Sequence, residues 1–207
     1  KATKIPKLRE YVIRRVSAIP GGYESALSHV EDAKTAEAVV AALAAQLKGE
    51  ASVTMPESWP KVYDLLKNNP KSEVKTALLT LAGKFGDKRL LPEFRKLLTD
   101  SQQPEALRLA ALTMLRDAGD TEAVPILHAL VSGPESPLRE PAIATLSTLQ
   151  QADSANVLIN AYAKLTLTEK ALVITTLTSR ATSSQALLEA IAAGSVPRSD
   201  LSVAGAR

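Results

Sequence analysis

Four basic residues recur along the chain at a nearly constant interval: Lys75, Arg108, Arg139 and Lys170 lie 33, 31 and 31 residues apart. Regular spacing of this length indicates an internal repeat. A cationic side chain at one position of every repeat can pair with a carboxylate, or it can line a groove that binds an anionic partner. The spacing therefore predicts a row of basic side chains along a repeated structure.

A second basic group lies at the start of the chain. Residues 1–15 contain six lysines and arginines against a single acidic residue, Glu10. We interpret this segment as the solvated face of a first helix, with a dock for an acidic partner as the alternative. The basic interaction patch would then consist of Lys4, Lys7, Arg9, Arg14 and Arg15.

The residue types that metal or redox chemistry needs are scarce. The chain has no cysteine, which excludes disulfides, thiolate catalysis and zinc–thiolate or iron–sulfur sites within it. The two histidines, His29 and His128, are far apart and have no second ligand at helical spacing. Asp117 and Asp120 could hold a hard cation, but we interpret them as a helix end followed by a helix N-cap. We expect no catalytic, metal or cofactor site in this chain.

Other signatures of binding chemistry are weak. The sequence has neither a glycine-rich phosphate-binding loop nor a Gly-x-Ser-x-Gly nucleophile elbow. Its net charge is only +3 and its aromatic content 3%, whereas nucleic-acid binding favours a basic stripe with aromatic side chains for stacking. The single tryptophan, Trp59, is expected to pack in the core or against a loop, with a ligand platform as the alternative.

Amphipathic helices must position the basic row. Apolar residues follow each basic residue at intervals of three and seven, which places them on one helical face. These residues are Leu78, Ala111, Ala142 and Val173 at the first interval, and Ala82, Leu115, Leu146 and Leu177 at the second. The same amphipathic helix is therefore expected four times along the sequence.

Two acidic residues on the later helices, Glu169 and Glu189, are expected to face solvent.

Another helix precedes each of these. Apolar clusters begin after Asp87, Asp120 and Asp153, which are 33 residues apart. Together with Ser183 these are plausible helix N-caps. The resulting unit is a helix–turn–helix of about 31 to 33 residues, which buries its apolar face only by stacking on its neighbours.

The second helix of two hairpins begins with a shared sequence motif, LRLAAL at residues 107–112 and LREPAI at residues 138–143. This motif resembles the one found in HEAT repeats. We therefore predict an all-α fold, an α-α superhelix of the HEAT/armadillo-like solenoid type with about five to six helical hairpins. We expect a single repeat domain over 1–207, part of a larger protein, with 1–56 irregular, 57–193 regular and a truncated last hairpin over 194–207.

In the HEAT family an acidic residue of the preceding turn often pairs with the basic residue of the second helix, and the pairs form a ladder along the array. The resemblance implies Asp100 as the partner of Arg108 and Glu135 as the partner of Arg139. The two lysines of the row depart from arginine and cannot make a bidentate contact.

A narrower resemblance lies in residues 177–201, with LTSR at 177–180, LLEAI at 187–191 and GSVPRSDL at 194–201. These resemble the helical region of planctomycete and verrucomicrobial membrane-bound dehydrogenases and PVC-type cytochromes c. In that family a propeller precedes the helical repeats and a c-type haem domain follows them. The resemblance implies an exported bacterial parent in the periplasm or cell envelope, although this chain contains no haem-attachment motif.

These observations favour a non-catalytic scaffold or protein-interaction module over an enzyme. Its partner would be another protein or the flanking domains of the same parent chain. A nucleic-acid-binding HEAT-like protein is one alternative, and an accessory domain of a haem-containing sugar-type dehydrogenase is another. Membrane insertion is not expected, since no apolar run approaches 18 residues.

Overall fold

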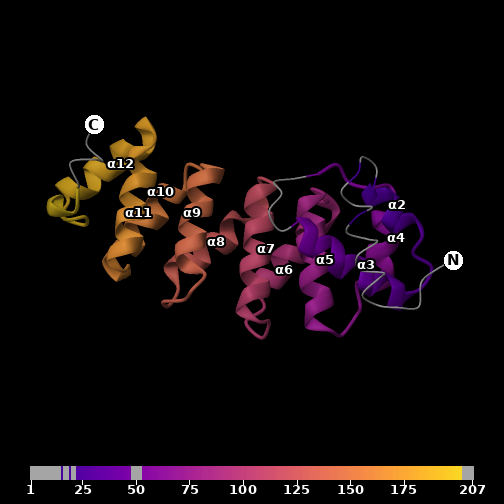
Figure 1. Cartoon of the computed structure of the whole chain (residues 1–207). Helices are drawn as coiled ribbons and strands as arrows, with labels where there is room; N and C mark the ends of the chain where they lie inside the picture. The colour runs from indigo at the N-terminus through magenta and orange to yellow at the C-terminus, as the bar shows by residue number, and fades with distance from the viewer. Residues whose placement is uncertain (1–14, 16–18, 20–21, 48–52, 202–207) are drawn as a thin grey trace. The chain divides into compact units, whose positions relative to one another are not determined.

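The computed structural model describes residues 15, 19, 22–47 and 53–201, and all regular structure in these residues is helical (Figure 1). Five pairs of α-helices and one final helix are found there. The prediction of an all-α solenoid of stacked hairpins is confirmed. The chain divides into two compact units, Lys1–Leu90 and Leu91–Arg207, whereas the predicted single domain with its internal boundaries stays a prediction.

Unit 1 contains two helical pairs in the described part of the chain. The helices are α2 (Gly22–Ser28), α3 (Ala33–Gln46), α4 (Trp59–Leu66) and α5 (Ser72–Lys84), followed by the 3-10 turn η2 (Lys88–Leu90). α2 packs on α4 and α3 packs on α5, so the first helices form one layer and the second helices another. The first helix expected in the basic segment 1–15 falls outside the described residues apart from Arg15.

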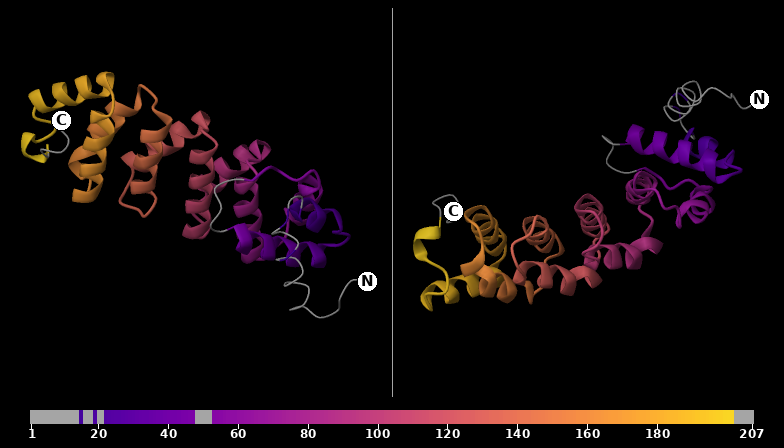
Figure 2. Two further views of the ribbon diagram at one scale, coloured as in Figure 1. Left: turned by 45° about the horizontal axis from the view of Figure 1, so that its top comes forward. Right: turned by 90° about the horizontal axis from the view of Figure 1, so that it is seen from below.

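Unit 2 repeats the arrangement. Its α-helices are α6 (Leu91–Thr99), α7 (Glu105–Asp117), α8 (Val124–Ser132), α9 (Arg139–Leu149), α10 (Ser154–Ala161), α11 (Leu167–Thr178) and α12 (Ala181–Ala192). Three 3-10 turns accompany them, η3 (Thr121–Ala123), η4 (Tyr162–Lys164) and η5 (Arg198–Asp200). In the first-helix layer α8 packs between α6 and α10, and α10 also contacts α12, while in the second-helix layer α9 packs between α7 and α11 (Figure 2).

The core contains the apolar residues that recur at fixed intervals along the sequence. The apolar residues three positions after each basic residue of the row are at most 3% exposed, and those seven positions after it are at most 1% exposed. Burying each Leu, Ile or Val side chain contributes about 1.5–3 kcal/mol, so this interior supplies most of the energy that holds neighbouring hairpins together. Among the residues described, no helix combines the length and apolar character needed to cross a membrane.

Two second helices end in the same way. α5 and α7 are each followed by a glycine in the left-handed region, Gly86 with φ 63° and Gly119 with φ 68°. The next amide turns back onto the helix, Asp87 donating to the carbonyl of Ala82 and Asp120 to that of Leu115, both at 2.9 Å. These hydrogen bonds satisfy carbonyl groups at the helix end, and the turn sets the direction of the next hairpin.

The predicted N-caps divide into two groups. Asp87 and Asp120 accept backbone N–H groups two residues on, at 3.3 Å each, and so begin the turns η2 and η3. Asp153 occupies the N-cap position of α10 without a side-chain hydrogen bond to the helix. The prediction for Ser183 is wrong, because α12 begins two residues earlier, at Ala181, and Ser183 lies inside its first turn.

Candidate functional site

An open groove of about 790 Å³ lies on the second-helix layer of unit 2. Its apolar surface consists of Pro137, Pro141, Ala144 and Leu172. Its polar surface consists of Arg116, Glu135, Ser136, Glu140, Thr166 and Glu169. These residues come from the end of α7, the loop before α9, the first two turns of α9 and the start and first two turns of α11. The groove therefore spans three neighbouring second helices.

A buried ion pair fixes one wall of this groove. Arg139 opens α9, and its Nε and Nη2 atoms donate to the two carboxylate oxygens of Glu169 at 2.7 and 2.8 Å. Arg139 is 2% exposed and Glu169 4%. The bidentate geometry is the strongest form of this contact, and it holds the starts of α9 and α11 together.

Glu169 also caps its own helix. Its Oε2 accepts the backbone N–H of Thr166 at 2.8 Å, while the Thr166 hydroxyl accepts the backbone N–H of Glu169 at 3.3 Å. This reciprocal arrangement is a capping box, which satisfies two free donors at the start of α11. The hydrogen bonds from Arg139 lower the pKa of Glu169 to about 2, despite the opposite effect of burial.

These contacts correct two expectations. Glu169 was expected to face solvent, but the capping box turns its carboxylate inward, where Arg139 meets it. Glu135, the implied partner of Arg139, is exposed on the groove, and Arg139 pairs one repeat further along the chain instead. The cause is the register between repeats, which brings the first turn of α11 directly beside the first residue of α9.

The other members of the basic row have other partners. Arg108 donates through Nε to the carbonyl of Leu98 at 3.0 Å, and Asp100 accepts instead from Gln103. Lys170 lies over the ring of Tyr162, with Nζ 5.3 Å from the ring centre, and Lys75 is half-buried on α5. The four residues thus occupy equivalent helices without sharing one kind of contact.

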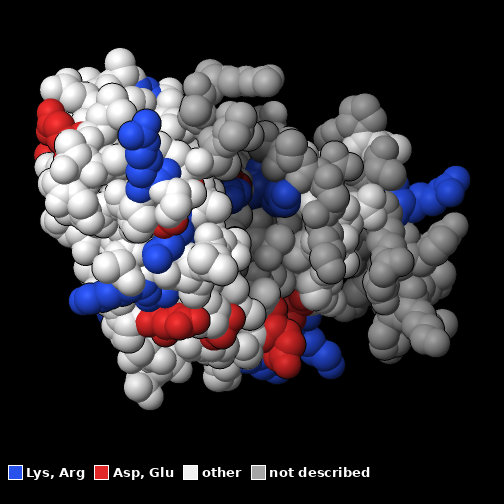
Figure 3. Space-filling view, turned by 90° about the vertical axis from the view of Figure 1, so that its left-hand side faces the viewer, with Lys and Arg blue, Asp and Glu red and all other residues white. Residues whose placement is uncertain are grey.

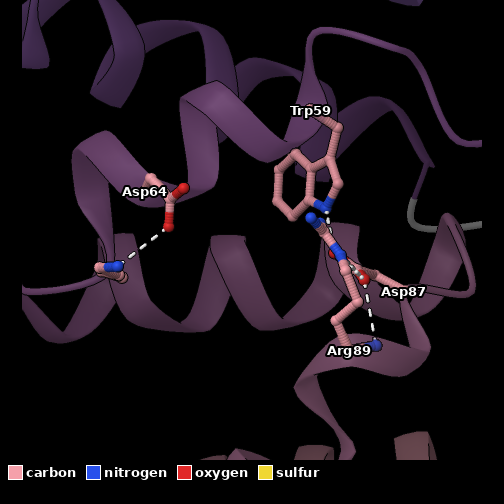
Figure 4. A network of polar contacts seen from close by, with 5 residues as sticks. Trp59, Asp64, Asp87 and Arg89 are labelled. Carbon is pink, nitrogen blue, oxygen red and sulfur yellow. Dashed lines mark hydrogen bonds and ion pairs between the residues drawn. The ribbon is translucent and has the colours of Figure 1, made fainter.

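On the first helices, a second set of polar contacts was not foreseen. In unit 1 the indole nitrogen of Trp59 donates to Asp87 Oδ2 at 2.9 Å, and Arg89 also donates to this carboxylate at 2.8 and 2.6 Å (Figure 4). Burial favours the neutral carboxyl, but the hydrogen bonds from Arg89 and Trp59 outweigh it and lower the pKa of Asp87. Trp59 is fully buried, packs against Phe85 and Tyr63, and is a core residue as expected.

Unit 2 contains equivalent contacts. The side chain of Arg95 on α6 forms ion pairs with Asp120 and Glu122 in the turn after the next helix. The Nε2 atom of His128 on α8 and the hydroxyl of Ser154 are hydrogen-bonded at 2.9 Å. The hydroxyl of Tyr162 donates to Asp200 at 3.0 Å. Residues of α4, α6 and α8, and Tyr162 directly after α10, therefore contact the start of the following repeat.

The repeat architecture is shared with a known family. Residues 59–147 match HEAT repeats. The matched segment runs from the first residue of α4 into α9, so the chain contains a HEAT-like helical repeat region. No curated protein matches the sequence.

Several candidate residues of the sequence lie apart from the groove of the HEAT-like region. Of the predicted basic patch, only Arg15 belongs to the described residues, where it is exposed, and Lys4, Lys7, Arg9 and Arg14 lie outside them. His29 bonds locally to the carbonyl of Ser25. Burial lowers the pKa of His128, with a small opposing effect of Asp153.

The two aspartates considered as cation ligands each have a cationic neighbour. Asp117 pairs with Arg116 at 2.8 Å, and Asp120 lies 3.1 Å from Arg95 Nε. The described part of the chain contains no group of three or more acidic, histidine or cysteine side chains arranged to hold a metal ion.

On the end of unit 2 that bears α12, uncharged side chains make up most of the described surface (Figure 3).

Proposed function

We propose that this chain is a non-catalytic helical-repeat scaffold that binds another protein through the groove of unit 2. The observation that carries the proposal is the groove itself, which spans the second-helix layer of a HEAT-like region. Stacked repeats present extended surfaces on which successive helices contribute to one partner. In this proposal the chain holds no cofactor or metal of its own.

The exposure of one large apolar side chain supports a protein partner. Leu167, between the groove residues Thr166 and Glu169, is 86% exposed. A protein partner would bury this side chain together with the apolar residues of the groove, with a gain of about 25 cal/mol for each Å² covered. A small molecule would need a more enclosed cavity, because such ligands are usually surrounded on most of their surface.

The alternatives have less support. Nucleic acid would bring phosphates to a groove whose exposed carboxylates are those of Glu135 and Glu140, and like charges repel. An accessory role beside a propeller and a c-type haem domain in an exported parent rests on the resemblance of residues 177–201. In that case the partner of the groove would be a flanking domain of the same parent chain.

Affinity capture with matched variants tests the proposal. The tagged full chain would be incubated with extract of its source organism, beside an Ala144→Trp variant that fills the groove and an Ala129→Trp variant. Ala144 lines the groove, whereas Ala129 is exposed on α8 in the other layer. We expect a protein that binds wild type and Ala129→Trp equally but loses about tenfold in recovery, or about 1.4 kcal/mol, with Ala144→Trp.

The far-UV circular dichroism of both variants must match wild type, so that loss of binding is not loss of folding. If the Ala144→Trp variant retained every partner that wild type captures, the groove would not be the binding surface. Recovery of nucleic acid in place of protein would favour the first alternative.

A further inference from the structure

The charges of the groove point to the chemistry of its partner. We propose that it binds an extended segment of another protein in which lysine or arginine alternates with apolar residues. This inference rests on the proposed function and specifies its ligand. It follows from the unbalanced charge of the groove, from its apolar floor and from the state of the nearby helix ends.

Two carboxylates of the groove form no ion pair within the described residues. Three carboxylates and one guanidinium line it, but Glu169 is neutralised by Arg139, and Arg116 by Asp117. Glu135 and Glu140 remain, both exposed, and within the described residues neither forms an ion pair. The groove is therefore negative by about two charges in a chain whose net charge is +3.

The groove also has an apolar part, and the exposed side chain of Leu167 follows the groove residue Thr166 in the chain. The floor of the groove is formed by two prolines with Ala144 and Leu172. Proline lacks an N–H group, so Pro137 and Pro141 cannot offer backbone donors to an acidic ligand. A partner with apolar side chains between its cations would cover the floor and Leu167 while its cations meet Glu135 and Glu140.

Helix N-termini in the same region would favour an anionic ligand, but their effect is smaller than that of the two carboxylates of Glu135 and Glu140. A free helix N-terminus carries about half a positive charge, and its influence falls off within the first turn. The N-terminus of α11 is already satisfied by the capping box of Thr166 and Glu169. The N-terminus of α9 has Glu140 in its own first turn. The two unpaired carboxylates therefore decide the sign of the ligand.

A pair of labelled peptides tests the inference. One peptide of about twelve residues, up to about 40 Å long when extended, alternates leucine with lysine, and its twin has glutamate in place of each lysine. Fluorescence anisotropy would measure the binding of each peptide to the full chain at about 0.05 M and about 0.5 M salt. We expect the basic peptide to bind at least about tenfold more tightly than its twin at low salt, and to lose most of this preference at high salt.

The matched variants locate the binding. A Glu135→Gln/Glu140→Gln double variant removes the two unpaired charges of the groove, and Glu31→Gln/Glu57→Gln removes two exposed charges of unit 1. We expect the groove variant to weaken the basic peptide about tenfold and the control variant to change its affinity less than about twofold.

Equal losses in both variants would mean a general effect of charge and would overturn the proposal, as would tighter binding of the acidic twin. The outcome is separable from that of the capture experiment. If Ala144→Trp abolishes capture of a protein while the basic peptide shows no preference, the groove is an interaction site for a different chemistry.

Discussion

Arg139 and Glu169 form a buried bidentate ion pair that links the start of α9 to the start of α11, one repeat apart. Both side chains are almost completely excluded from water, and Glu169 also accepts the backbone N–H of Thr166. A buried charge is costly unless its partner is present. The pair therefore fixes the register between two hairpins and the wall of the groove.

Removing one partner should destabilise the protein strongly. Arg139→Met leaves the carboxylate of Glu169 buried and uncompensated, which should lower the free energy of unfolding by about 3–5 kcal/mol. Adding Glu169→Gln, which preserves an acceptor for the capping box, should recover at least about half of this loss. Urea unfolding followed by far-UV circular dichroism measures both. Strictly additive losses would show that the two side chains are not coupled.

The same pair predicts a dependence on pH. The folded-state pKa of Glu169 is about 2, below its ordinary value of 4.5, so the unfolded chain binds the proton more readily. Its contribution is fully present above about pH 4.5 and is lost as the pH falls toward 2, by about 3 kcal/mol in total. The difference in unfolding free energy between wild type and Glu169→Gln should shrink by about 2 kcal/mol between pH 6 and pH 3. A difference independent of pH would contradict the assignment.

The Trp59–Asp87 contact gives a separate prediction for unit 1. Asp87→Ala leaves the buried indole N–H without its acceptor and removes the N-cap of η2, so we expect a loss of about 2–3 kcal/mol. Asp87→Asn keeps a carbonyl oxygen for both contacts and should lose less. Because Trp59 is the single tryptophan, its fluorescence during urea unfolding reports on this unit directly. Equal losses in the two variants would mean that the acceptor oxygen is not what matters.

A backbone prediction concerns the end of α7. A Cβ atom at Gly119 would meet nothing within 4 Å, so the only cost of Gly119→Ala is its φ of 68°. We expect a loss of about 1–2 kcal/mol in unfolding free energy, and a smaller loss for Gly119→Asn, since asparagine tolerates this conformation better. Thermal unfolding of the two variants checks the order. If alanine were tolerated as well as asparagine, α7 would have to end in a different conformation.

The sequence predicts the helices and the core because both depend on local periodicity. Leu78, Ala111, Ala142 and Val173 occupy equivalent helical positions, and a residue that faces the neighbouring hairpin in one repeat does so in the next. The glycine–aspartate turns at 86–87 and 119–120 can also be predicted from the sequence, because they recur at the same interval as the helices.

Polar contacts between repeats could not be predicted in this way. Arg139 has Glu135 four residues before it and Glu169 thirty residues after it, and the choice depends on how neighbouring hairpins are aligned. The contacts of Trp59 with Asp87 and of His128 with Ser154 are separated by 28 and 26 residues. A search for polar pairs about one period apart would have found these candidates, although it could not have chosen among them.

Site-specific photocrosslinking in the source organism tests the central claim most directly. A photoreactive benzoylphenylalanine would replace Ser136, which lines the groove, and in a parallel strain Ala129, which lies in the other layer. We predict a discrete protein adduct from position 136 that is absent from position 129 and is lost when Glu135→Gln and Glu140→Gln are combined. Adducts of equal yield from both positions, or from position 129 alone, would contradict the assignment of the groove as the binding surface.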